Sequence, residues 1–134
     1  MLDINKIIEP LHEDEVWRTV VIDGVSYDRY LVSTYGRVLS LNYKNTGEIK
    51  LLKQSKNNNG YLKVSLSYNT ISKGYMVHRI VAETFDDMIL TDDDTLKECV
   101  RHKDGNHYNN HISNLYWLSY EEALQPKNKE NSVK

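Results

Sequence analysis

The chain has 134 residues, a formal net charge of −2 and one cysteine, Cys99. This length suits one domain with a core of its own, and a single cysteine excludes an internal disulfide or a cysteine-based zinc cluster. No apolar stretch reaches the roughly 18 residues that a membrane span needs, and residues 1–6 lack the basic and then apolar pattern of a secretory signal. We therefore expect a soluble, cytoplasmic protein with no membrane partner.

The small net charge hides a strong segregation along the chain. Residues 29–79 carry nine Lys and Arg side chains against one acid, Glu48, and both flanking segments are acidic. Charges are screened beyond ~8 Å at physiological ionic strength, so this segment can attract a polyanion although the whole chain is slightly acidic. The segment is interleaved with tyrosines, whose rings keep a polar tip. It is a candidate nucleic-acid surface, and the competing interpretation is a solvated face.

Hydrophobic periodicity predicts the secondary structure in chain order. A helix is expected over residues 2–11, limited by Pro10. Strands are expected over residues 16–22, 25–27, 30–35, 37–41, 49–54 and 61–68, with turns at Asp23-Gly24, Gly36 and residues 69–74. Residues 75–85 should pass from a strand end into a helix. The β-rich first half followed by helical segments indicates an α+β protein.

The second half adds an acidic loop and a polar centre. Residues 86–95 hold five aspartates and are predicted to form a solvated spacer that repels phosphate. Two short strands, 98–101 and 115–118, then flank a segment dense in polar side chains. A helix should follow, with Ser119 as its N-cap and Glu122 at the capping-box position.

Several spaced motifs in the second half resemble the HNH endonucleases of the phage and intron homing type. The motifs are His102-Lys103-Asp104-Gly105-Asn106, Asn109-Asn110 and Asn114-Leu115-Tyr116-Trp117, and His78-Arg79-Ile80-Val81-Ala82-Glu83-Thr84-Phe85 is similar to the helix that precedes them in that family. Residues 17–41 are similar to the small DNA-binding module that often stands before such units. The resemblance spans about residues 15–124.

The resemblance implies a fold and a division of the chain. Residues 1–75 would form an antiparallel β-rich DNA-binding lobe with an N-terminal helix. Residues 76–125 would form a ββα-metal unit, also called an HNH or His-Me finger, and residues 126–134 a polar tail. It also implies a protein encoded by a phage or mobile element and acting in the cytoplasm of a bacterial host.

The resemblance also implies roles for particular residues. His102 would be the general base that activates water for phosphodiester hydrolysis, with Asn114 holding the loop and orienting the histidine. Mg²⁺ or another divalent metal would stabilise the developing charge. Relatives place metal ligands directly before the base histidine and nine residues after the middle asparagine, where this chain has Arg101 and Ala123.

Neither a guanidinium nor a methyl group can ligate Mg²⁺, which prefers hard oxygen donors. The substitute ligands that the sequence offers are Asp104, Glu121 and Glu122. The sequence leaves open whether Ala123 is the natural residue or an inactivating replacement.

The expected partner is double-stranded DNA. The candidate DNA-binding residues are Arg37, Lys53, Lys56, Tyr61, Lys63, Arg79 and Arg101. Arg37 directly follows the turn at Gly36 and can project outward.

Three functions remain open from the sequence. The first is a homing-type nuclease that nicks or cuts DNA if its metal site is intact. The second is a catalytically degenerate HNH scaffold that acts as a DNA-binding or regulatory protein. The third is a phage-encoded inhibitor that binds a protein partner through the acidic segment 86–94.

Overall fold

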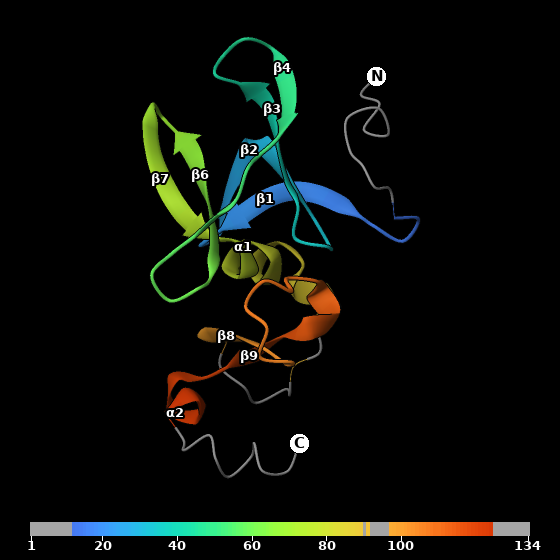
Figure 1. Ribbon diagram of the computed structural model, residues 1–134, viewed down its shortest axis with the longest axis vertical. Coiled ribbons are helices and arrows are strands. Elements are labelled where there is room, and N and C mark those ends of the chain that lie inside the picture. Colours follow the sequence, from blue (N-terminus) through green and yellow to red (C-terminus); the bar gives the residue numbers. More distant parts are fainter. Residues whose placement is uncertain (1–11, 90, 92–96, 125–134) are drawn as a thin grey trace.

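The computed structural model describes residues 12–89, 91 and 97–124. Within these residues the chain forms three antiparallel sheets of four, three and two strands around one central helix (Figure 1). The mixed, mostly antiparallel fold agrees with the α+β class expected from the sequence. None of the described helices is long and apolar enough to cross a membrane.

The first sheet contains β1 (Trp17–Ile22), β2 (Val25–Ser33), β3 (Val38–Tyr43) and β4 (Glu48–Leu51), paired in that order. The predicted hairpin at Asp23-Gly24 is confirmed, since β1 pairs with β2 across these two residues. Both residues have positive φ, as the tight turns favoured between antiparallel strands require.

The second sheet contains β5 (Ser55–Lys56), β6 (Leu62–Tyr68) and β7 (Ile71–Met76). The alternation predicted for β6 is confirmed, because Val64 and Leu66 are buried between exposed neighbours. The predicted turn over residues 69–74 is wrong in extent. The turn is Asn69-Thr70, and residues 71–74 belong to β7. A strand is predicted from alternating apolar and polar residues. These four residues are exposed and show no such alternation, so the sequence did not predict them as part of a strand.

Helix α1 (Val77–Thr84) follows β7 directly and leads into a short 3₁₀ helix, η2 (Asp86–Met88). The third sheet pairs β8 (Cys99–His102) with β9 (Leu115–Leu118), which follows a second 3₁₀ helix, η3 (Ile112–Asn114). Helix α2 (Tyr120–Ala123) comes last. The predicted capping box between Ser119 and Glu122 is confirmed.

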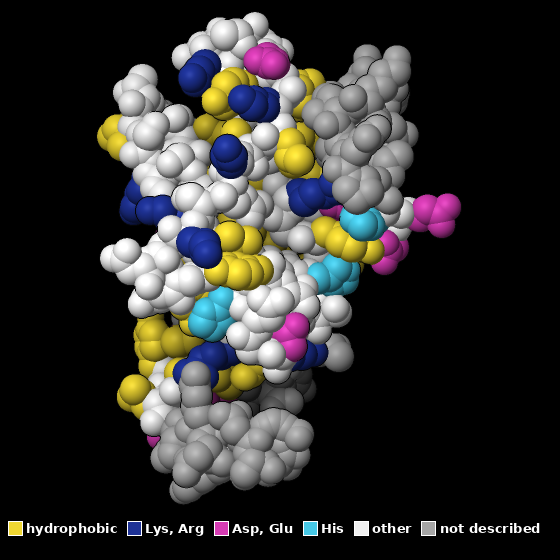
Figure 2. Space-filling model, in the orientation of Figure 1, with side chains coloured by type: hydrophobic (Ala, Val, Ile, Leu, Met, Phe, Trp, Pro, Cys, Tyr) yellow, Lys and Arg dark blue, Asp and Glu magenta, His cyan; other side chains and the backbone are white. Residues whose placement is uncertain are grey.

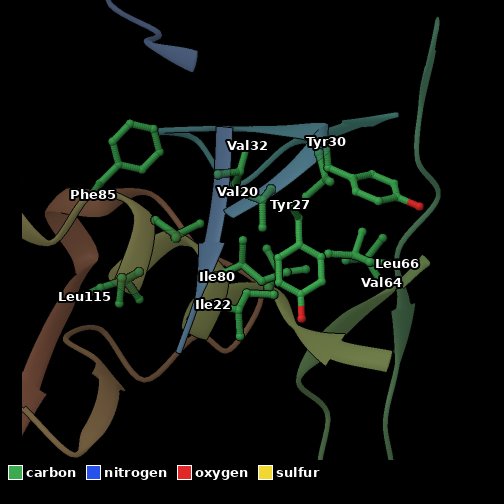
Figure 3. Packing of buried hydrophobic residues seen from close by; sticks show 14 of the residues in the cluster. Val20, Ile22, Tyr27, Tyr30, Val32, Val64, Leu66, Ile80, Phe85 and Leu115 are labelled. Atoms are coloured by element: carbon green, nitrogen blue, oxygen red, sulfur yellow. The ribbon is translucent and has the colours of Figure 1, made fainter. Parts of the chain in front are cut away.

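One cluster of buried side chains contains residues from all three sheets and from α1. Figure 3 shows side chains of β1, β2, β6, α1 and β9 converging in it, with Tyr27 beside Ile80 and Leu66. Helix α1 contributes four residues to this cluster, Val77, Ile80, Val81 and Ala82. The predicted boundary between residues 75 and 76 falls within β7, one residue before that strand ends, and stays a prediction.

Two expectations lie wholly or partly outside the described residues. The helix over residues 2–11 and the tail 126–134 are not described. Of the acidic segment 86–94, the described start is engaged within the chain, since Asp87 pairs with Arg18 (2.6 Å) and Asp86 with Lys97 (2.8 Å). Nothing in this geometry supports the protein partner expected for that segment.

Candidate functional site

His102 lies at the end of β8 and is buried, with 8% of its surface exposed. Its Nε2 donates to Asn110 Oδ1 at 2.6 Å. Burial lowers the pKa of His102, although the hydrogen bond to Asn110 opposes this effect. The imidazole is therefore neutral at pH 7. With its proton on Nε2, the unprotonated Nδ1 is the atom that can accept a proton.

Asn114 holds the loop between β8 and β9 in shape. Its Nδ2 donates to Asp104 Oδ1 (2.9 Å) and to the Asn109 carbonyl (2.8 Å), and its Oδ1 accepts from the Asp104 amide (3.1 Å). Among the described contacts, the hydrogen bond that orients His102 comes from Asn110 and not from Asn114. The sequence included Asn110 in the motif without a role, since nothing local shows which asparagine faces the histidine.

Two further histidines and a tyrosine from different segments surround His102. His78 of α1 and His107 of the loop lie 5.0 and 5.4 Å from His102, measured between ring centroids. Tyr61 stacks on His107 at 3.9 Å. Burial, together with the neighbouring histidines, lowers the pKa of His78 to about 4. The sequence placed Tyr61 on a DNA surface and gave no role to His107, whereas their rings pack on each other.

The turn between β2 and β3 packs against the loop that joins β8 to β9. Gly36 has φ +87°, and a Cβ there would lie 2.8 Å from Asn110 Cβ. The Thr34 carbonyl accepts from the Ile112 amide at 3.0 Å. The turn predicted at Gly36 thus touches the residue that orients His102.

The positions expected to hold metal ligands are joined to each other. Arg101 Nη2 donates to the Ala123 carbonyl at 3.0 Å. Of the substitute ligands, Asp104 accepts three hydrogen bonds within its loop, Glu122 closes the capping box, and Glu121 is exposed. In the described part of the chain, no three His, Cys, Asp or Glu side chains are placed to hold a metal ion. The described residues at these positions do not fit a divalent cation.

Two of the arginines expected to contact DNA form ion pairs within the protein. Arg37 forms a two-pronged ion pair with Glu15, and its side chain is 16% exposed, so the expectation that it projects outward is wrong. Arg79 pairs with Glu83 (2.6 Å) and donates to the Glu98 carbonyl (2.8 Å). These partners are distant in sequence or on a helix face, so composition did not reveal them.

The lysines are arranged differently. Lys50, Lys53 and Lys63 line a hollow of about 330 Å³ between β4 and β6, together with Tyr43 and other residues. Lys56 lies over the exposed Tyr108 ring at 5.5 Å, beside the loop that carries His107. Figure 2 shows Lys and Arg side chains along one face, from the tip of the β3–β4 hairpin to the histidines. Of the predicted lysines, Lys56 thus lies beside the loop that carries His107.

Comparison with known proteins agrees with this architecture. Residues 15–67 match the NUMOD4 motif. Over 104 residues, the chain is 36% identical to an uncharacterized HNH endonuclease, L245, of Acanthamoeba polyphaga mimivirus, which covers 78% of this chain. A second mimivirus protein, L247, is also 36% identical, over 93 residues and 69% of the chain. The chain is therefore similar to the HNH endonucleases of the homing type.

A solved structure extends the likeness to three dimensions. The HNH homing endonuclease I-HmuI, whose structure is described as showing DNA binding and cleavage, matches 89% of this chain and 60% of its own, with a TM-score of 0.64 and 28% identity. This chain spans 27% and 21% of the length of the two mimivirus HNH proteins. Because both come from a virus of amoebae, the phage origin has no support from them, and the cytoplasmic location stays a prediction.

Proposed function

We propose that this HNH protein binds double-stranded DNA and does not cleave it in a metal-dependent way. The observation that carries the proposal is the lysine-lined hollow between β4 and β6 in a chain related to homing endonucleases. The division into a β-rich DNA-binding lobe and a C-terminal ββα unit is part of the same proposal.

The hollow has the electrostatic character of a phosphate-binding surface. Lys50, Lys53 and Lys63 converge on one space, and none of them forms an ion pair with a described acid. Like charges gathered in this way repel each other, and a polyanion relieves that repulsion while releasing its own counterions. Tyr43, with Lys50 over its ring at 4.3 Å, adds a flat apolar surface.

A duplex on this face would continue to the HNH loop. Strand β6 begins beside Tyr61, which stacks on His107, and Lys56 lies over Tyr108 of the loop. A phosphate bound there would lie close to His102, whose neutral imidazole is in the state that a general base needs. The base is therefore retained, and what the described residues do not offer is a set of oxygen ligands for Mg²⁺.

Binding is tested by fluorescence anisotropy with a duplex oligonucleotide between about 50 and 200 mM salt. Affinity should fall steeply with salt, and Lys53→Gln should reduce the slope of log K against log salt by about 1, the loss of one phosphate contact. Lys97→Gln is the matched control, because Lys97 is paired with Asp86. A DNA affinity that does not change with salt concentration, or equal changes of the salt slope in the two variants, would contradict the proposal.

Cleavage is tested with supercoiled plasmid and Mg²⁺ or Mn²⁺, using the natural chain and His102→Ala. We expect intact plasmid with both proteins. Nicking by the natural chain that His102→Ala abolishes would establish a nuclease and overturn the second half of the proposal.

A further inference from the structure

Arg101 and Ala123 occupy the two positions at which HNH relatives carry metal ligands, and these two residues are in contact. Arg101 lies on β8 directly before His102, and Ala123 is the last residue of α2. Their hydrogen bond of 3.0 Å shows that the side chain at position 101 reaches the end of that helix. The Arg101 guanidinium therefore lies against the Ala123 main chain.

The guanidinium suits this place for two reasons. The last carbonyls of a helix lack partners within it, and the Arg101 guanidinium supplies a donor to the Ala123 carbonyl at the end of the single turn of α2. Arginine stays charged at all ordinary pH values and carries five donors, of which the described contacts use one. Its remaining donors match the geometry of a phosphate.

We propose that Arg101 replaces the metal ion of the HNH site, so that a fixed guanidinium binds a DNA phosphate beside His102 and excludes divalent cations. The inference rests on the proposed DNA binding. It adds that the HNH site itself is a metal-independent phosphate site and that residues 101 and 123 together determine this.

Divalent cations are excluded by the positive charge of Arg101 and by the lack, among the described residues, of free oxygen ligands around it. A divalent cation at the end of β8 would stand next to a permanent positive charge that cannot be deprotonated. Ala123 offers no side-chain oxygen, and Asp104 accepts from Asn106, Asn109 and Asn114. Replacing both residues should remove the repulsion and supply two oxygen ligands at once.

The first test measures Mn²⁺ binding to the DNA-free protein by calorimetry and electron paramagnetic resonance. The natural chain should take up no Mn²⁺ at millimolar concentration, and Arg101→Asp combined with Ala123→Asn should bind about one equivalent. Arg101→Lys is the control, since it keeps the charge and should exclude Mn²⁺. Uptake by the natural chain, or none by the double variant with a native circular dichroism spectrum, would overturn the inference.

The second test measures DNA affinity in the presence of EDTA. Binding by the natural chain should be unchanged by the chelator, and Arg101→Gln should weaken it about tenfold and lower the salt slope by about 1. If Arg101→Gln binds as tightly as the natural chain, the guanidinium is not a phosphate ligand. If no variant binds DNA, the proposed function fails, whereas the Mn²⁺ experiment still tests the exclusion of metal by itself.

Discussion

At the residue scale, burial governs the protonation state of His78, which lies beside His102. His78 packs within α1 against Tyr61 and His102, and its Nδ1 is buried without a hydrogen-bond partner among the described residues. A charged imidazole there would lose its hydration without compensation. The pKa of about 4 is the consequence, and it ties the histidine cluster to the stability of the fold.

Stability should therefore fall in mild acid. The folded-state pKa of His78 lies below the ordinary value of 6.5, so the unfolded chain takes up the proton first as the pH drops. The contribution is fully present above about pH 6.5 and is lost between there and pH 4, by up to about 3 kcal/mol. Urea unfolding across this range should show the loss, and His78→Phe should show a smaller one.

Hydrogen bonds within the loop lower the pKa of Asp104, so protonation of this carboxylate in acid also reduces the stability of the folded protein. All carboxylates are identical in the two proteins, so the difference between the two pH profiles isolates His78. Parallel profiles would show that His78 is not buried as a neutral imidazole.

At the element scale, the turn between β2 and β3 acts as a support for the HNH loop. Gly36 lies against Asn110, the hydrogen-bond partner of His102, and its own carbonyl accepts from Gln54 Nε2 (2.7 Å). Residues from the first sheet therefore determine the geometry of a histidine in the third sheet. The glycine is required twice, by its positive φ and by the close approach of Asn110.

Gly36→Ala should destabilise the protein by about 2–4 kcal/mol, the sum of the left-handed backbone and the forced displacement of Asn110. Gly47→Ala is the matched control, because Gly47 has φ +82° with open space around it and should cost only about 1–2 kcal/mol. Chemical denaturation gives both values. The imidazole NMR signals of His102 should shift in the first variant only, and a shift in neither would remove the proposed support.

At the scale of the whole molecule, the buried cluster makes the parts of the chain depend on one another. Leu115 of β9 and Val20 of β1 lie in the same cluster, with α1 between the sheets. A core shared in this way favours a single unfolding transition. The predicted lobes need not then be independent folding units.

Leu115→Ala should cost about 2–5 kcal/mol, since Leu115 is 1% exposed and cannot be replaced without a cavity. Hydrogen exchange should show the loss of protection in β1 and β2 as well as in β8 and β9. Leu124→Ala, at a site 84% exposed, should change neither. Loss confined to β8 and β9 would instead support two units divided near residue 75.

The sequence by itself determined the features that depend on neighbouring residues. The Asp23-Gly24 hairpin, the alternation of β6 and the capping box of α2 follow from local backbone and side-chain preferences. The order and spacing of the HNH motifs identified the family in the same way. The exposed hairpin strand β7 was missed over residues 71–74 because it has no apolar alternation.

Only the tertiary structure decided which chemical groups meet. Glu15 holds Arg37 inside the protein, Asn110 takes the hydrogen bond expected of Asn114, and Arg101 reaches Ala123. Each pair is separated by 8 to 22 residues, and each choice depends on how sheets pack around α1. Residue types define which contacts are chemically allowed, but long-range packing selects among them, because many polar side chains compete for the same few buried partners.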